Sequence, residues 1–143
     1  MHTTNIQLLS SKNVDEIVQL TKHLNPTIEM DTLKKRQTEM FQMGNFVCFG
    51  LYYNEDLIGI SGGWITVRLY SGKQLEIDNF IIDPKIHSKG YGQQFLKAME
   101  KWALDQNCET VELNTYVQNS GSHKFYFRNN FSILGYHFQK SIV

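Results

Sequence analysis

The sequence is poor in the residues that cross-link or interrupt a chain, with two cysteines and two prolines among 143 residues. Two cysteines cannot build a disulfide scaffold. Cys48 and Cys108 each lie inside an apolar run, outside any metal or redox spacing, so we interpret them as small buried residues. An excess of charge is also missing, because fourteen basic side chains balance fourteen acidic ones. This balance argues against a nucleic-acid-coating surface and against an acidic tail.

Long apolar runs are missing as well. No run approaches the roughly 20 residues that a membrane-spanning helix needs, and the N-terminal residues lack the cationic and apolar pattern of a signal peptide. We therefore expect a cytoplasmic protein that has neither a membrane nor a nucleic acid as its partner. With 41% hydrophobic and 13% aromatic residues, the chain should form one globular domain over residues 1–143.

Apolar periodicity and turn residues predict an α/β fold. We expect a mixed, mostly antiparallel sheet that contains a central parallel strand–helix–strand unit. The predicted order is β-α-α-β-β-β-α-β-α-β. In the same order, the predicted ranges are 5–9, a helix capped by Asn13 and broken at Asn25-Pro26, 31–43, 46–53, 57–67, 75–82, 90–106, 110–116, 119–130 and 131–143.

Two glycines mark the point at which a predicted strand passes into a predicted helix. Gly90 and Gly92 follow Asp83-Pro84 and directly precede the helix. Glycine lets a ligand approach the backbone closely, and the first amides of a helix favour an anion, most often a phosphate. Lys85 and Lys89 add positive charge beside these glycines. The common phosphate-loop and dinucleotide-loop spacings are absent.

Two carboxylates stand out in the strand before this loop. Glu76 and Asp78 are two residues apart, so both point to one face of the strand, between apolar neighbours. A buried carboxylate needs a partner or a function, because an unpaired buried charge is costly. The sequence leaves two interpretations open: surface or ion-paired groups, or groups that act in chemistry.

The loop His87-Ser88-Lys89-Gly90-Tyr91-Gly92 and the later segment 119–131 resemble, in this order, the two motifs of the GCN5-related N-acetyltransferase (GNAT) family. His87 departs from the first motif, where the family usually has Gln or Arg. In the second motif Asn119 and Tyr126 match, whereas Ser122 replaces Ala and Asn130 replaces Gly.

This resemblance implies an acetyl-CoA-dependent N-acetyltransferase. It would transfer an acetyl group directly to a primary amine of a small molecule, peptide or protein, without an acyl-enzyme or a metal. Tyr126 would serve as the acid and Asp78 as the base, directly or through water, with Glu76 as the alternative base or a substrate ligand. The expected coenzyme-binding residues are Phe80, Ile81, Ile82, His87, Ser88, Lys89, Gly90, Tyr91, Gly92, Gln93, Asn119 and Tyr126.

Several questions stay open at this stage. A coenzyme-A-binding regulatory module of the same fold is the alternative function, and a homodimer is compatible with the family. The acceptor and the length of the acyl group are not readable from the sequence. A polyamine acceptor would suit an acidic pocket formed by Glu29, Asp31, Glu76 and Asp78.

Overall fold

The computed structural model describes residues 3–86 and 90–143. The chain divides into two compact units, residues 1–112 and 113–143. The first unit contains most of the sheet and the helices that cover it, and the second begins with the last residue of β5.

The first unit is built on a mixed sheet with the strand order β1-β2-β3-β4-β5. The first three neighbouring pairs are antiparallel. The parallel pair is therefore β4–β5, which α3 connects, as the strand–helix–strand pattern predicted. The strands are β1 (Thr4–Leu9), β2 (Phe46–Tyr53), β3 (Asp56–Arg68), β4 (Gly72–Ile82) and β5 (Thr110–Leu113).

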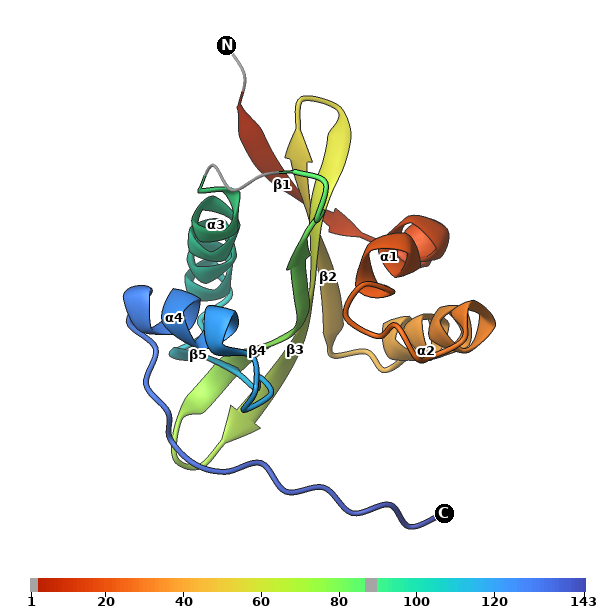
Figure 1. Cartoon of the computed structure of the whole chain (residues 1–143). Coiled ribbons are helices and arrows are strands. Elements are labelled where there is room, and N and C mark those ends of the chain that lie inside the picture. The colour runs from red at the N-terminus through yellow and green to blue at the C-terminus, as the bar shows by residue number, and fades with distance from the viewer. Residues whose placement is uncertain (1–2, 87–89) are drawn as a thin grey trace. The chain divides into compact units, whose positions relative to one another are not determined.

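Helices cover both faces of this sheet (Figure 1). On one face lie η1 (Ser11–Asn13), α1 (Val14–Thr21) and α2 (Met30–Gln42), and on the other lies α3 (Tyr91–Asp105). The α1 side packs around Ile17, Cys48 and Ile60, with Phe41 of α2 against them. The α3 side holds aromatic pairs that join helix to strand, such as Phe49 with Trp102 at 5.0 Å. The hydrophobic core thus forms two layers, one on each side of the sheet.

A β-bulge interrupts β4 at Asn79. The pairing register with β3 shifts between Ile60 and Gly62, and Asn79 has a φ of 54°. Asparagine is among the few non-glycine residues that occupy this left-handed region with any frequency. Beyond the bulge, Phe80 stacks on Phe95 of α3 at 5.3 Å, whereas Ile81 packs on the α1 side.

The second unit contains α4 (Ser120–Arg128) and a C-terminal segment. The Asn119 side chain caps α4 by accepting a hydrogen bond from the Ser122 amide at 3.3 Å. Asn130 follows the C-cap Asn129 and adopts a left-handed φ of 68°, the conformation in which glycine most often follows a helix. Residues 131–143 form neither a helix nor a strand.

The structure corrects three local predictions. The closing strand over 131–143 is not formed in the single chain, and β5 ends at Leu113 rather than at residue 116. Asn13 does not cap α1; its side chain accepts a hydrogen bond from the Ser10 amide in a capping box for η1.

Among the described residues, no helix is both long and apolar enough to cross a membrane.

Candidate active site

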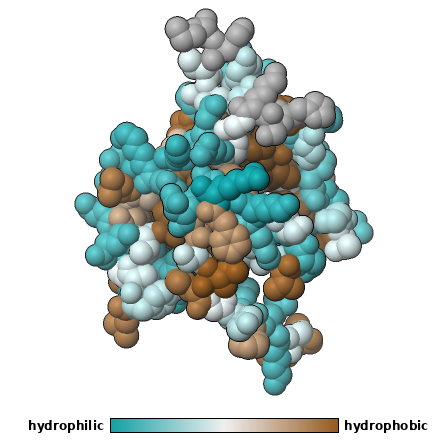
Figure 2. All heavy atoms as spheres, turned by 60° about the vertical axis from the view of Figure 1, so that its left-hand side comes forward, coloured by the Kyte–Doolittle hydropathy of each residue, from teal (hydrophilic) through white to brown (hydrophobic). Residues whose placement is uncertain are grey.

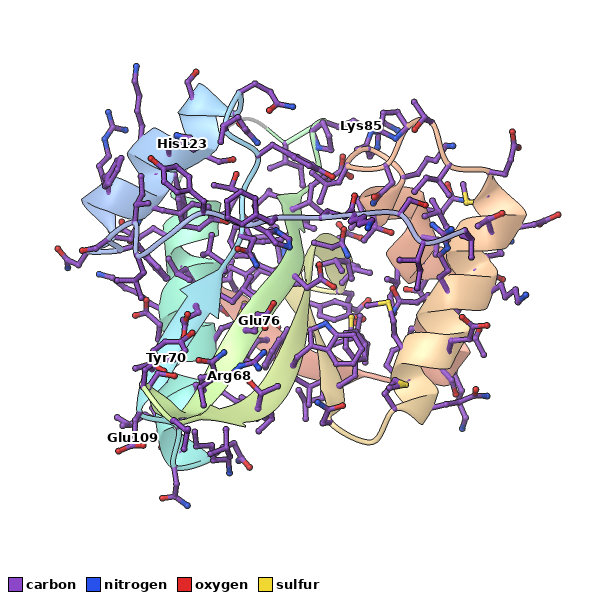
Figure 3. All side chains as sticks on the ribbon, turned by 90° about the horizontal axis from the view of Figure 1, so that it is seen from below. Arg68, Tyr70, Glu76, Lys85, Glu109 and His123 are labelled. Atoms are coloured by element: carbon purple, nitrogen blue, oxygen red, sulfur yellow. The ribbon has the colours of Figure 1, made fainter. Side chains whose placement is uncertain are left out.

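Glu76 and Asp78 project from the same face of β4, and both are half-buried (Figure 3 labels Glu76). Glu76 lies opposite Trp64 of β3, and Asp78 lies opposite Gly62. Because Gly62 has no side chain, the Trp64 indole can lean toward Asp78, and its Nε1–H donates to Asp78 Oδ2 at 3.3 Å. Trp64 in turn packs on Phe46 at 4.8 Å. These contacts place the two carboxylates on the α1 and α2 side of the sheet.

Neither carboxylate has a cationic partner among the described residues. The ion pairs there are Lys34–Asp15 and Lys101–Asp105. Two half-buried negative charges at neighbouring positions on one face repel each other, and they favour a cation that enters between or beside them. This arrangement favours the interpretation that the carboxylates act on a ligand over the interpretation that they form internal ion pairs.

Asn25, in the segment between α1 and α2, connects that segment to the bulge. Its Nδ2 donates to Asn79 Oδ1 at 3.3 Å and to Thr21 O at 2.9 Å. Lys22 braces the same segment by donating to the carbonyls of Pro26 and Ile28. Side-chain hydrogen bonds therefore join the bulge, which directly follows Asp78, to the α1–α2 segment.

The loop after β4 has the geometry of a turn into a helix. The Lys85 amide donates to Asp83 Oδ1 at 3.0 Å, and Gly90 precedes α3 with a φ of 79°. A residue with a side chain rarely adopts that φ, which explains the glycine. Tyr91, Gly92 and Gln93 form the first turn of α3. The predicted coenzyme contacts of His87, Ser88 and Lys89 lie outside the described residues.

The outer edge of β4 is only partly flanked by β5. The Glu109 amide donates to Lys73 O at 2.7 Å, so β5 begins beside the start of β4. β5 has four residues and β4 has eleven. The second half of β4, which contains the predicted coenzyme residues Phe80, Ile81 and Ile82, therefore extends beyond β5.

Tyr126 and Asn119 belong to the second unit. Tyr126 packs between Phe125 and Phe131, with ring centroids 5.3 and 5.4 Å away. Burial raises the pKa of the Tyr126 phenol to about 12, so the hydroxyl keeps its proton at neutral pH. His123 Nε2 lies 2.9 Å from Tyr116 O. This bond gives His123 a structural role on α4.

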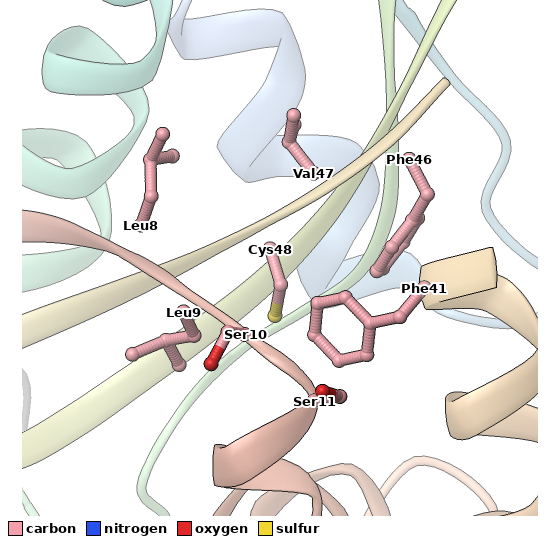
Figure 4. Close-up of a pocket in the computed structure, with 8 residues that line it drawn as sticks. All are labelled: Leu8, Leu9, Ser10, Ser11, Phe41, Phe46, Val47 and Cys48. Carbon is pink, nitrogen blue, oxygen red and sulfur yellow. The ribbon is translucent and has the colours of Figure 1, made fainter. Parts of the chain in front are cut away.

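A cavity of about 300 Å³ lies elsewhere in the first unit (Figure 4). It is formed by the end of β1, η1, the end of α2 and the start of β2. None of the predicted site residues lines it. Cys48 lines the cavity, but burial raises the pKa of its thiol to about 12, so Cys48 is a poor nucleophile.

No group of three His, Cys, Asp or Glu side chains suited to a metal occurs in the described ranges.

With this geometry in place, comparison with known proteins identifies the family. Residues 14–131 match the acetyltransferase (GNAT) family, and the chain belongs to it. The chain is accordingly an acetyltransferase of the GNAT type. No curated protein sequence matches it.

Solved structures share the fold at low identity. An aminoglycoside N-acetyltransferase, AAC(6')-Iy in complex with CoA, is 17% identical, with a TM-score of 0.84 and coverage of 100% of this chain and 97% of that one. A GNAT family acetyltransferase of Staphylococcus aureus subsp. aureus USA300_TCH1516 is 21% identical (TM-score 0.77, coverage 98% and 99%). An aminoglycoside acetyltransferase from an uncultured soil metagenomic sample, in complex with sisomicin, is 14% identical (TM-score 0.78, coverage 98% and 97%).

Sequence reasoning missed the tertiary contacts around Asp78. Trp64 donates a hydrogen bond to Asp78 itself, and Asn25 donates one to the neighbouring Asn79. One signal was available for Asn79, because an asparagine between two apolar stretches of a predicted strand is typical of a bulge. Nothing comparable in the sequence marks Trp64 or Asn25.

Proposed function

We propose that the protein transfers an acetyl group from acetyl-CoA to a primary amine that arrives as a cation. The observation that carries this proposal is the pair Glu76 and Asp78, two half-buried carboxylates without a described cationic partner. Such a pair attracts an ammonium group and gives it an acceptor for its proton. Relatives that are aminoglycoside acetyltransferases support an amine acceptor.

The chemistry assigns one role to each candidate residue. Asp78, directly or through a water, takes a proton from the ammonium, and the free amine attacks the thioester carbonyl carbon. A C–N bond forms and the C–S bond breaks, with the sulfur leaving toward the Tyr126 hydroxyl. The nitrogen loses its second proton, which passes through water to the departing sulfur, so that coenzyme A leaves as the thiol. With a pKa near 12, Tyr126 is a weaker acid than an ordinary thiol, so its contribution is a hydrogen bond that stabilises charge on the departing sulfur. The products are an amide and coenzyme A.

The loop and α3 are proposed to hold the pyrophosphate of the coenzyme. The left-handed Gly90 and the first amides of α3 form a backbone anion site, and Lys85 and Lys89 supply charge nearby in sequence. The second half of β4, including Phe80 to Ile82, offers backbone groups to the pantetheine arm. Asn119 and Tyr126 are assigned to the same arm.

Calorimetric titration with coenzyme A tests this assignment. We expect the wild-type chain to bind it and to melt roughly 10 °C higher at saturating coenzyme, since a ligand at about 100 times its Kd adds about 2.7 kcal/mol. ATP alone should give no comparable shift. Gly90→Val finds open space for its side chain but is strained at the left-handed φ of 79°. We expect it to lose at least tenfold in affinity, with circular dichroism showing that the chain still folds. Gly121→Ala in α4, where the φ is not left-handed and the space is also open, is the control. Coenzyme binding without any amine-dependent thiol release would instead indicate the regulatory module.

A further inference from the structure

Trp64 combines a half-buried aromatic ring with a hydrogen bond to the proposed base. Apolar residues scattered on a protein surface are ordinary, and Figure 2 shows them as brown patches among hydrophilic residues. Trp64 instead lies half-buried in β3, and its indole Nε1–H donates to Asp78 Oδ2 at 3.3 Å. An indole N–H at this depth needs an acceptor, and a carbonyl or a water would serve. The indole therefore does not require a carboxylate, whereas a carboxylate that acts as a base gains from a fixed donor.

The Trp64 ring is the end of a row of three aromatic side chains. In the sheet register Trp64 lies between Phe46 of β2 and Glu76 of β4. Its ring packs on Phe46 at 4.8 Å, and Phe46 meets Phe41 of α2 edge-on at 5.2 Å. Aromatic pairs at these distances attract each other, so the row limits the movement of the indole. The row therefore connects α2 to the group that holds Asp78.

Gly62 provides the space that this arrangement needs. It lies directly opposite Asp78 in the register. A Cβ at Gly62 would lie 3.0 Å from Cε1 of the Phe46 ring and 3.1 Å from the Asp78 carbonyl oxygen, which is closer than ordinary van der Waals contact. The φ of Gly62 is not left-handed, so close packing, rather than backbone conformation, explains the glycine. A side chain here would push the Phe46 ring against its neighbours.

The hydrogen bond from Trp64 occupies one oxygen of Asp78 and leaves the other for a ligand. Trp64 donates to Oδ2, and in the part of the chain that the structure describes no donor reaches Oδ1. We propose that Trp64 is a positioning residue for acetyl transfer, whose N–H fixes Oδ2 so that Oδ1 takes the proton of the acceptor ammonium, directly or through a water. The indole is a donor only and keeps its own proton. This inference rests on the proposed function, because it uses Asp78 as the base.

A double-mutant cycle in the thiol-release assay tests the role of Trp64. Trp64→Phe keeps a ring against Phe46 and removes the N–H. We expect it to lower kcat/KM for the amine by roughly 10- to 10²-fold, as misplacement of a reacting group does. The loss should be largest at low pH, as for Asp78→Asn, while the coenzyme Kd stays unchanged. In the Asp78→Asn background Trp64→Phe should change kcat/KM by less than about twofold, because the base that it positions is already gone.

Nuclear magnetic resonance tests the bond without any turnover. The chain has two tryptophans, Trp64 and Trp102, so its indole N–H groups give two signals, and Trp102→Phe shows which one belongs to Trp64. We expect Asp78→Ala to shift the Trp64 signal and to speed its exchange with water. Gly62→Ala should shift the same signal. Gly50→Ala, whose methyl group meets other side chains at 2.9–3.1 Å, is the matched control and should leave the signal in place. Circular dichroism shows that each variant folds.

Failure of this inference and failure of the proposed function give different results. If the wild type releases thiol with an amine but the losses from Trp64→Phe and Asp78→Asn add, or the Trp64 loss is uniform across pH, then Trp64 is a packing residue and only this inference is overturned. A Trp64 signal that does not respond to Asp78→Ala would also overturn it, because the bond would then be absent. If no amine causes thiol release in the wild type, the proposed function fails, and the role of Trp64 fails with it.

Discussion

At the scale of the single residue, burial keeps the Tyr126 hydroxyl protonated. With its pKa raised to about 12, the phenol stays neutral until the pH passes about 11, so its titration cannot shape activity in the neutral range. Tyr126→Phe keeps the ring against Phe125 and Phe131 and removes only the hydroxyl. We expect kcat to fall by roughly 10- to 10³-fold while the coenzyme Kd stays within about twofold. Steady-state kinetics measures kcat, and calorimetry measures the coenzyme Kd. Full turnover in the variant would make Tyr126 a packing residue.

Asp78 and Glu76 form a matched pair, because they share a face, a strand and a charge. Only Asp78 accepts the Trp64 indole hydrogen bond, which orients its carboxylate. We expect Asp78→Asn to reduce kcat/KM most at low pH, where the acceptor amine is mostly charged and a base is needed. The loss should shrink as pH approaches the pKa of the amine. Glu76→Gln should raise KM more than it lowers kcat. The reverse pattern in a pH–rate series would assign the base to Glu76.

The bulge in β4 is the element that distinguishes this sheet from a regular one. It turns Phe80 toward α3 and leaves Asp78 on the face of α1 and α2. Asn79→Gly and Asn79→Ala both lose the hydrogen bond from Asn25, so the difference between them isolates the φ of 54° at this position. Because a Cβ in the left-handed region costs about 1–2 kcal/mol, we expect the alanine variant to melt roughly 5 °C below the glycine variant. Equal melting temperatures would contradict a left-handed conformation at Asn79.

Local patterns were sufficient to predict most elements of the first unit. The strand 46–53 matches β2, and the helix 90–106 matches α3 to within a residue at either end, because turn residues and glycine bound both. The bulge, the Trp64–Asp78 bond and the Asn25–Asn79 bond depend on tertiary pairing, which no single segment specifies. The C-terminal segment shows the opposite limit. Its alternation predicted a closing strand, and that prediction was wrong, because residues 131–143 form neither a helix nor a strand. A period of two marks a sequence that suits a strand, but it does not supply the neighbouring strand that one needs.

At the scale of the whole molecule, the protein has the GNAT fold, and its β4 strand carries two carboxylates, Glu76 and Asp78. The coenzyme is anionic, whereas the proposed acceptor is cationic. Separate regions of the sequence are suited to each: the lysines and helix amides at the loop before α3, and the carboxylates in the middle of β4. Although the net charge is zero, one region is therefore suited to an anion and the other to a cation. The acceptor preference is the central claim, because it links the two carboxylates to the reaction.

Thiol release from acetyl-CoA measures that claim directly. The assay compares a linear diamine with a monoamine of the same chain length, at equal concentration and pH, with the wild type and with Glu76→Gln. We predict amine-dependent release, at least tenfold higher kcat/KM for the diamine, and loss of most of that preference in Glu76→Gln, where one of the two attracting charges is gone. Equal rates for the two amines in the wild type, or a preference that Glu76→Gln leaves intact, would contradict the account.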